Sequence, residues 1–196
     1  MLDHTVRRIR HILDNYKPST SQLKTSTSAA VALILQPREK DLHLLFIHRA
    51  HNPQDPWSGH MAFPGGRKNP GDDDLCETIH RETKEEVGID LALHGEYLGR
   101  MAELQAMSHG RPIDMTIVPF VYLISSEVKI KPAPVEVQDT IWVPLEFLQQ
   151  DQGQCREQSS IPDGKTCVPA LVYGGKTIWG LTYQMLREFL KLIAKG

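Results

Sequence analysis

Short apolar runs separated by turn-forming residues recur along this chain, and segments of helical spacing interrupt them at irregular intervals. Three of the runs, at residues 29–35, 43–48 and 116–124, have the length of strands and are too short for typical helices. A doubly wound parallel sheet needs strands and helices in regular alternation, and this order lacks it. The sequence therefore predicts a mixed α/β fold, an α/β/α sandwich in which helices cover both faces of a mixed β-sheet.

Apolar residues recur at helical spacing in an amino-terminal segment, at about residues 3–16, and in a carboxy-terminal segment, residues 181–194. Another helix follows Asp74, a predicted N-cap with Glu77 three residues on, and Gly88 is its predicted terminator. The remaining expected elements are strands at residues 97–101 and 140–143, a short helix within 144–150, a mobile polar segment at 151–164, and a hairpin of 168–173 with 176–179 around Gly174 and Gly175.

Length and charge limit what this chain can do. Its 196 residues are expected to form one domain, residues 1–196, that acts alone or as a homodimer. A net charge of -2 provides no overall positive field for a nucleic-acid backbone or an anionic membrane surface. Cys76, Cys155 and Cys167 form no CxxC pair, and no apolar run approaches the ~20 residues of a membrane helix. We therefore expect a cytoplasmic protein that binds neither nucleic acid nor membrane.

Three glutamates crowd one turn of the helix that follows Asp74. Glu82 and Glu86 project about 40° apart around the helix axis, and Glu85 lies about 60° from Glu82 on its other side. Apolar residues border this arc, so packing would hold the carboxylates at the edge of the buried face. Like charges held so close raise one another's pKa unless a cation neutralises them. Hard divalent ions such as Mg²⁺ or Mn²⁺ prefer oxygen ligands, so this turn is a candidate metal site.

The same turn has a simpler interpretation, a solvated helix face on which Arg81 and Glu85 form an i,i+4 ion pair. The segment before the helix favours the metal site instead. Gly65 and Gly66 follow Phe63 and one proline, and a double glycine lets the backbone turn sharply and approach a ligand closely. A loop of this kind that leads into a helix amino end can offer N–H groups to phosphate oxygens.

These features together resemble the Nudix box, a loop-helix-loop signature with a glycine, an upstream glutamate, Arg-Glu, Glu-Glu and a final glycine at set spacings. The matching residues are Arg81-Glu82, Glu85-Glu86, Gly88 and Ile89. Counted back from the arginine, Asp73 stands where the box has its upstream glutamate, and Gly66 lies one residue further away than the standard spacing. Thr83 replaces an apolar residue of the box. The longer loop is similar to that of the coenzyme A pyrophosphatase branch of the family.

Resemblance to that branch extends from about Ala29 to Leu192. Gly59 and the Phe-Pro-Gly-Gly that follows it are similar to the second half of the branch's coenzyme A signature. The branch has an arginine four residues before this glycine, where the chain has Asp55, and Arg49 is the nearest upstream substitute. The resemblance implies a small nucleoside diphosphate substrate, with coenzyme A first. ADP-ribose, dinucleotides or oxidised nucleotides are alternative substrates, and a non-catalytic nucleotide-binding regulator is an alternative of another class.

The resemblance also implies roles for single residues in a hydrolysis that depends on Mg²⁺ or Mn²⁺. Glu82, Glu85 and Glu86 would bind the metal, and Glu82 and Glu85 count as catalytic. Arg81 would orient Glu85, and Gly88 would end the helix.

A general base is expected either in the box or in a distal loop. Glu136, which precedes a predicted strand, is the distal candidate, with a plain surface glutamate as the alternative and Glu103 as a weaker candidate. The residues expected to contact substrate are Arg49, Gly65, Gly66 and Phe63. For Phe63 the alternative is a place in the hydrophobic core.

Overall fold

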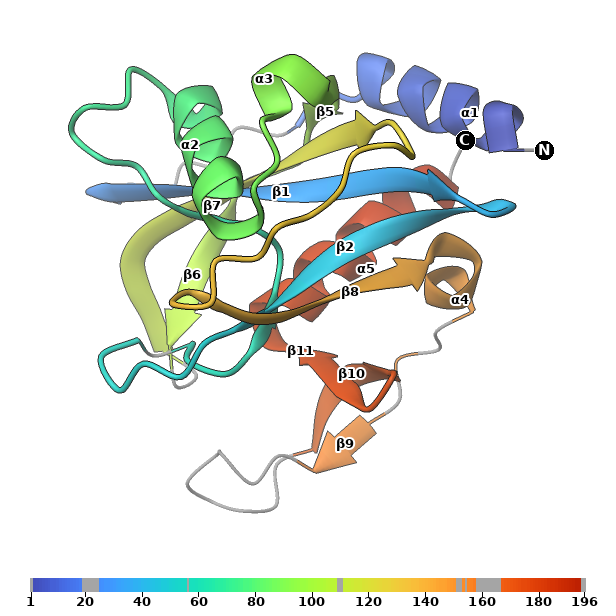
Figure 1. Cartoon of the computed structure of the whole chain (residues 1–196). Coiled ribbons are helices and arrows are strands. Elements are labelled where there is room, and N and C mark those ends of the chain that lie inside the picture. Colours follow the sequence, from blue (N-terminus) through green and yellow to red (C-terminus); the bar gives the residue numbers. More distant parts are fainter. Residues whose placement is uncertain are drawn as a thin grey trace.

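The computed structural model describes residues 2–18, 25–55, 57–108, 111–150, 153, 155–157 and 167–194. Its elements (Figure 1) are α1 (Leu2–Asn15), β1 (Thr27–Arg38), β2 (Asp41–Arg49), β3 (Met61–Ala62), β4 (Gly65–Arg67), α2 (Leu75–Val87), α3 (Leu91–His94), β5 (Gly95–Arg100), β6 (Leu104–Ser108), β7 (Arg111–Ile124), β8 (Val137–Pro144), α4 (Leu145–Gln149), β9 (Cys155–Glu157), β10 (Cys167–Tyr173), β11 (Lys176–Trp179) and α5 (Gly180–Ala194). Most of the segment predicted to be mobile, 151–164, lies outside the described residues.

The larger sheet of the described residues has eight strands and is mixed. β3, β2, β1, β7 and β5 are neighbours in that order, while β4 pairs with β1, β6 with β7 and β8 with β2. β1 runs parallel to β7, whereas β2 and β4 run antiparallel to β1. A second sheet, β11-β10-β9, contacts the larger one where β11 meets β3.

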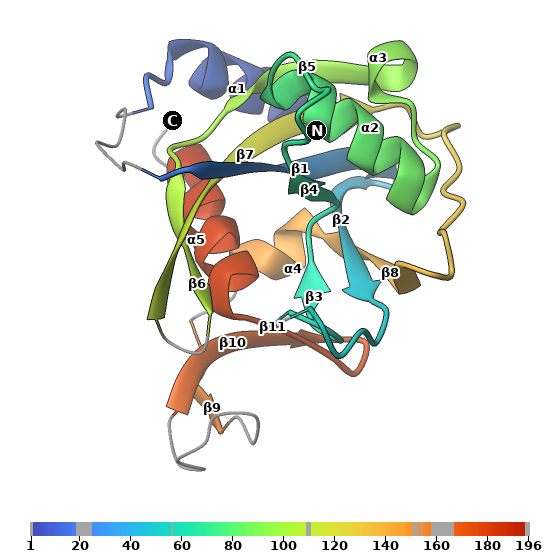
Figure 2. The ribbon, with the colours of Figure 1, turned by 90° about the vertical axis from the view of Figure 1, so that its left-hand side faces the viewer.

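Alternate residues of the central strand β1 belong to two different apolar clusters. Leu33 and Leu35 pack with residues of α1, α4 and α5, whereas Ala32 and Ile34 pack with residues of α2 and α3. Figure 2 shows α2 and α5 on opposite sides of β1 and β7. All four side chains are fully buried, as expected for a strand that is covered on both faces. The predicted α/β/α arrangement around a mixed sheet is therefore confirmed.

The helix α2 begins and ends at the predicted residues. The Asp74 carboxylate accepts the backbone N–H of Glu77 at 2.9 Å, and Gly88 caps the other end with φ of 70°, where a glycine avoids steric strain. Thr83, which replaces an apolar residue of the Nudix box, is fully buried. Its hydroxyl donates to the Ile79 carbonyl at 2.6 Å, so this polar group is satisfied inside the core.

The predicted hairpin around Gly174 and Gly175 is confirmed, because β10 pairs with β11 there, and β1 pairs with β2 in a second hairpin. The strand β7 begins five residues earlier than predicted, at Arg111, because it forms a hairpin with β6 that the sequence did not reveal. The short elements α3, β4 and β9 were also missed, since so few residues carry no periodic signal. No helix in the described part of the chain is long and apolar enough to cross a membrane. A single domain over residues 1–196 stays a prediction.

Candidate active site

The strand β4 places the double glycine against the acidic face of α2. The Gly65 N–H donates a hydrogen bond of 2.8 Å to Oε2 of Glu86. Gly65 has φ of +145°, and a Cβ atom there would collide with the Ala30 carbonyl oxygen of β1. A Cβ atom at Gly66 would collide with the Glu82 carboxylate. Only glycines allow this close approach, which holds two carboxylates of α2 beside the central sheet.

Among Glu82, Glu85 and Glu86 of α2, Glu86 is the most buried, with 3% of the residue exposed. Burial raises the pKa of Glu86 to about 8, although the Gly65 N–H and the positive charge of Arg49 act in the opposite direction. The negative charges of Glu82 and Glu136 raise that pKa as well. The ionised form of Glu86 is therefore costly unless a cation approaches it.

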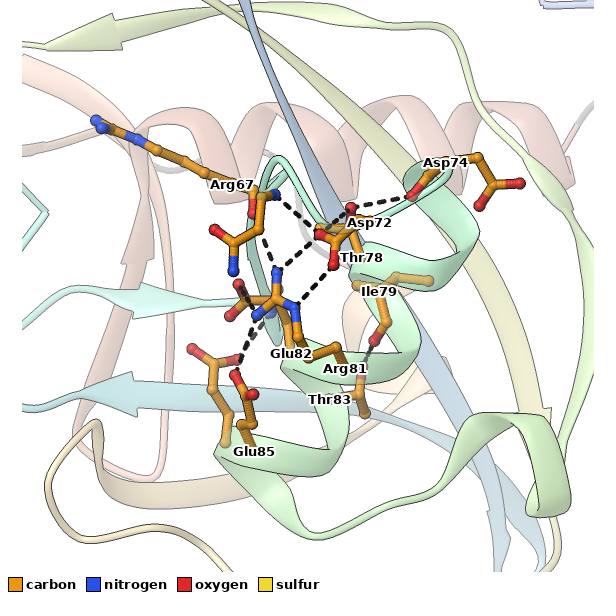
Figure 3. Close-up of polar contacts among 12 residues, drawn as sticks. Arg67, Asp72, Asp74, Thr78, Ile79, Arg81, Glu82, Thr83 and Glu85 are labelled. Carbon is orange, nitrogen blue, oxygen red and sulfur yellow. Dashed lines mark hydrogen bonds and ion pairs between the residues drawn. The ribbon is translucent and has the colours of Figure 1, made fainter.

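Arg81 connects the carboxylates of α2 to the loop before the helix (Figure 3). Its Nη1 donates to Oε1 of Glu82 at 2.8 Å and to Oε2 of Glu85 at 3.1 Å. Its Nε and Nη2 donate to the carboxylate of Asp72. Burial raises the pKa of Glu82, while Arg81 partly offsets this effect. The ion pair of Arg81 with Glu85, expected if this turn were a solvated helix face, is present. The same guanidinium, however, also binds the buried carboxylate of Asp72.

Asp72 is the residue of this network that the sequence interpretation missed. It is 7% exposed, and it also accepts the hydroxyl of Thr78 at 2.9 Å and the backbone N–H of Asn69 at 2.9 Å. The Arg81 guanidinium, more than these other donors, holds the pKa of Asp72 well below its usual range. Counting forward from Gly66 instead of back from the arginine would have found it, because the sixth residue after Gly66 is Asp72.

Asp73, the residue chosen by counting back from the arginine, is exposed, and its backbone N–H donates to the carboxylate of Glu77. Asp72, and not Asp73, therefore contacts Arg81. The equivalence of Asp73 with the upstream glutamate of the box stays a prediction.

The loop before β8 brings Glu136 to the acidic face of α2. The backbone carbonyl of Glu136 accepts the N–H of Ala50 at 2.8 Å, and the Ala133 N–H donates to the carbonyl of Glu86 at 2.9 Å. The loop is thus attached both to the end of β2 and to the end of α2. The charge of Glu136 raises the pKa of both Glu82 and Glu86, so the three carboxylates lie within electrostatic reach of one another.

Arg49, the last residue of β2, lies at the edge of this acidic group. Its Nη1 is 3.7 Å from Oε1 of Glu86. Its Nε and Nη2 donate to Oδ2 of Asp55 at 2.9 Å and 2.7 Å. The positive charge of Arg49 therefore lies beside the buried Glu86 carboxylate, and Asp55 of the next loop holds the guanidinium in that place.

The sequence that carries these glutamates, glycines and arginine matches a known protein family. A model of the NUDIX domain matches residues 25–163, which is more than half of the chain. The chain belongs to the NUDIX domain family. This membership confirms the predicted resemblance, and a family relative supports the predicted class of enzyme, a pyrophosphohydrolase.

That relative is the mitochondrial coenzyme A diphosphatase NUDT8 of Homo sapiens, which is 27% identical to this Nudix chain over 190 residues. The alignment covers 91% of this chain and 75% of the human protein. An uncharacterized protein of Schizosaccharomyces pombe is 35% identical over 118 residues, which cover 59% of this chain but only 36% of that protein. A solved Ap4A hydrolase of C. elegans shares the fold, with a TM-score of 0.56 and 20% identity over 87% of this chain and 99% of that one.

Within this Nudix fold, two of the predicted substrate contacts need correction. The Phe63 ring is 2% exposed and stacks on Phe46 with centroids 4.9 Å apart, so it belongs to the core and has no open face for a base. The Gly65 N–H is bonded to Glu86 and is not free for a phosphate oxygen. The double glycine also does not lead directly into the helix amino end, because a loop of residues 68–74 intervenes. Glu103 lines a pocket with residues of α5, including Gln184.

The site fits a divalent cation by its chemistry, although its carboxylates do not form a preformed cage. Among the described residues, no three His, Cys, Asp or Glu side chains are close enough together to hold a metal ion as they stand. Glu86 is bonded to Gly65 and Glu82 lies against the neighbouring Gly66, and burial raises the pKa of both glutamates. A hard cation would relieve this excess of buried negative charge. Nudix hydrolases generally need divalent metal ions.

Proposed function

We propose that this Nudix protein hydrolyses the diphosphate bond of coenzyme A or a coenzyme A derivative with a bound Mg²⁺ or Mn²⁺. The observation that carries the proposal is the pair of Glu86 and Glu82 against the double glycine of β4, together with Glu136, whose charge acts on both. The human coenzyme A diphosphatase that aligns with 91% of this chain supports the choice of substrate. A cytoplasmic location and a homodimer stay predictions.

The carboxylates of α2 have distinct roles in this proposal. Glu82 and Glu86 are the main metal ligands, and Glu85, whose side chain is 52% exposed, is a further ligand or contacts the metal through water. When bound, the cation neutralises charge on the phosphate oxygens and lowers the pKa of bound water. Arg81 holds Glu82 and Glu85 in place through the hydrogen bonds from its Nη1.

Glu136 is the proposed general base. Water attacks one phosphorus of the diphosphate bridge, the bridging oxygen leaves with the other phosphate, and the proton of the water passes to Glu136. The carboxylate of Glu136 is exposed, so it can reach a solvent molecule, and its backbone is fastened to Ala50 of the neighbouring segment. Arg49 contacts the phosphates at the edge of the site.

Product analysis tests this function. The purified chain is incubated with coenzyme A or ADP-ribose and with Mg²⁺ or Mn²⁺, and the products are identified by mass spectrometry. Coenzyme A is expected to give phosphopantetheine and 3',5'-ADP, whereas ADP-ribose would give AMP and ribose 5-phosphate. Faster turnover of ADP-ribose, of a dinucleotide or of an oxidised nucleotide would reject coenzyme A as the substrate. An absence of turnover with every diphosphate would favour the non-catalytic regulator.

Calorimetry tests the metal site separately from the substrate. Mg²⁺ is expected to bind the wild-type chain in the presence of a nucleotide, and the double variant Glu82→Gln/Glu86→Gln is expected to lose this binding. The variant Glu127→Gln is the matched control, because Glu127 is an exposed glutamate outside the site. If neither Mg²⁺ nor Mn²⁺ binds the wild-type chain, with or without nucleotide, the proposed hydrolase function is withdrawn.

A further inference from the structure

Asp55 is built firmly into the loop between β2 and β3. Its backbone N–H donates to the Asn52 carbonyl at 3.0 Å, and its backbone carbonyl accepts the Ser58 N–H at 3.0 Å. Its side chain is also fixed, because Oδ1 accepts the Trp57 N–H at 3.0 Å. The loop therefore sets both the position and the orientation of this carboxylate, and 14% of the side chain is exposed.

The carboxylate of Asp55 binds one edge of Arg49 and leaves the rest of the guanidinium available. Both Nε and Nη2 of Arg49 donate to Oδ2 of Asp55. The distance of 3.7 Å from Nη1 to Oε1 of Glu86 is too long for a hydrogen bond, so this end of the guanidinium is not committed to Glu86. A guanidinium has five N–H donors in a planar fork, which suits the oxygens of a phosphate group.

We propose that Asp55 is a positioning residue that orients Arg49 so that the Nη1 end of its guanidinium binds a diphosphate beside Glu86. This inference rests on the proposed function only in taking a diphosphate as the ligand. Asp55 thus supplies a guanidinium indirectly, and its ion pair with Arg49 neutralises a carboxylate that would otherwise repel phosphate.

Steady-state kinetics of single and double variants test the inference. Asp55→Asn is expected to raise KM for coenzyme A about tenfold and to change kcat less than about twofold, because Arg49 loses its orientation while the metal ligands stay in place. Asparagine has one acceptor oxygen, which cannot serve both the Trp57 N–H and Arg49. Asp55→Glu, which keeps the charge, is expected to restore part of the loss.

A double-mutant cycle separates positioning from a structural effect. In the background of Arg49→Gln, the change Asp55→Asn is expected to have no further effect on KM, because there is no guanidinium left to orient. Ser58→Ala is the matched control in the same loop: it removes the hydroxyl that accepts the Asn52 N–H at 2.8 Å and contacts neither Arg49 nor Asp55 through that hydroxyl. This variant is expected to leave KM unchanged. An equal effect of Asp55→Asn with and without Arg49 overturns the proposal, and so does an unchanged KM in the single variant.

Binding of inorganic pyrophosphate, measured by calorimetry with Mg²⁺ present, distinguishes failure of this inference from failure of the proposed substrate. Suppose that coenzyme A is not hydrolysed, but that pyrophosphate binds about tenfold more weakly to Asp55→Asn than to the wild type. If pyrophosphate also binds with equal affinity to Arg49→Gln and to the double variant, Asp55 acts as proposed and only the substrate is wrong. If pyrophosphate binds equally to the wild type and Asp55→Asn, or does not bind at all, the inference is rejected.

Discussion

The carboxylate of Asp72 receives two hydrogen bonds from the guanidinium of Arg81, from Nε to Oδ1 at 3.1 Å and from Nη2 to Oδ2 at 3.0 Å. Such a bidentate pair holds a guanidinium in a fixed orientation. In that orientation Nη1 reaches the carboxylates of Glu82 and Glu85. The loop before α2 therefore determines, through Arg81, how Glu82 and Glu85 are held.

Replacing Asp72 by asparagine is expected to lower both the melting temperature and the activity. The loss in kcat/KM should be about tenfold or more, since Asp72 acts through Arg81 on the metal ligands. Asp73→Asn is the matched control, because the side chain of Asp73 is exposed and its position is one residue away. Equal effects of the two variants, in activity assays and thermal unfolding, would contradict the assignment of Asp72.

The stability contributed by Asp72 should depend on pH. The pKa of Asp72 is lowered in the folded chain, chiefly by the Arg81 guanidinium, so its stabilising effect is complete above the ordinary carboxyl pKa of about 3.9. The effect is lost as pH falls below that value and the folded-state carboxylate takes up its proton. The difference in melting temperature between the wild type and Asp72→Asn is therefore expected to shrink from pH 7 to pH 3. A constant difference would argue against this linkage.

Gly66→Ala should disturb the site through the Glu82 carboxylate. The added Cβ atom would come too close to that carboxylate, so the Glu82 side chain has to move away from β4. The expected result is a loss of activity with little change in melting temperature, because the end of a flexible side chain can move at low cost. Gly71→Ala is the matched control, because a Cβ atom at Gly71 would meet no heavy atom within 4 Å. Full activity in Gly66→Ala would show that catalysis does not need the close contact between Gly66 and the Glu82 carboxylate.

Glu86→Gln separates the need for charge from the need for shape. Glutamine fills the same space but is a weaker ligand, so kcat is expected to fall about a hundredfold or more while the fold is kept. Circular dichroism and turnover at saturating Mg²⁺ measure the two effects. A variant that keeps full metal-dependent turnover would refute the assignment of Glu86 as a ligand.

The same variant has an expected pH signature when a chelator removes the metal. The folded pKa of Glu86 is raised to about 8, so the folded chain keeps a proton that the unfolded chain releases above the ordinary carboxyl pKa of about 4.3. Wild-type stability that depends on this proton is complete below that value and falls as pH rises toward 8. Glutamine does not titrate, so Glu86→Gln does not lose stability in this way. The melting temperature of Glu86→Gln should therefore rise relative to that of the wild type between pH 5 and pH 8. A gap that does not change with pH would exclude the linkage.

Glu136→Gln should reduce catalysis without reducing stability. A general base contributes about a hundredfold or more to kcat, and the exposed side chain of Glu136 contributes no burial to the fold. Glu127→Gln, at another exposed loop position, should leave both kcat and the melting temperature unchanged. If Glu136→Gln retains wild-type kcat, Glu136 is not the general base.

Much of the fold could be predicted because its signals are local. Asp74 and Gly88 delimit α2 through capping chemistry that involves only residues within one helical turn. The strands β1 and β2 are long apolar runs, and Gly174 with Gly175 adopts the positive φ that a tight hairpin turn requires. The short strand β4 was missed, because it has only three residues and its partner β1 lies elsewhere in the chain. The hairpin of β6 and β7 was missed too, although its two strands are neighbours in the chain.

The sequence by itself determined the spacing of Glu82, Glu85 and Glu86 on one helix turn and the presence of a double glycine before it. Only the tertiary structure decided that Asp72 and not Asp73 binds Arg81, that Phe63 lies in the core, and that Glu136 joins the acidic group. Helical spacing follows from backbone geometry within a few residues, whereas these contacts join residues of different segments of the chain. They form when β4 pairs with β1, α2 packs on the sheet and the loop before β8 attaches to both, and no local pattern of residues specifies that combination.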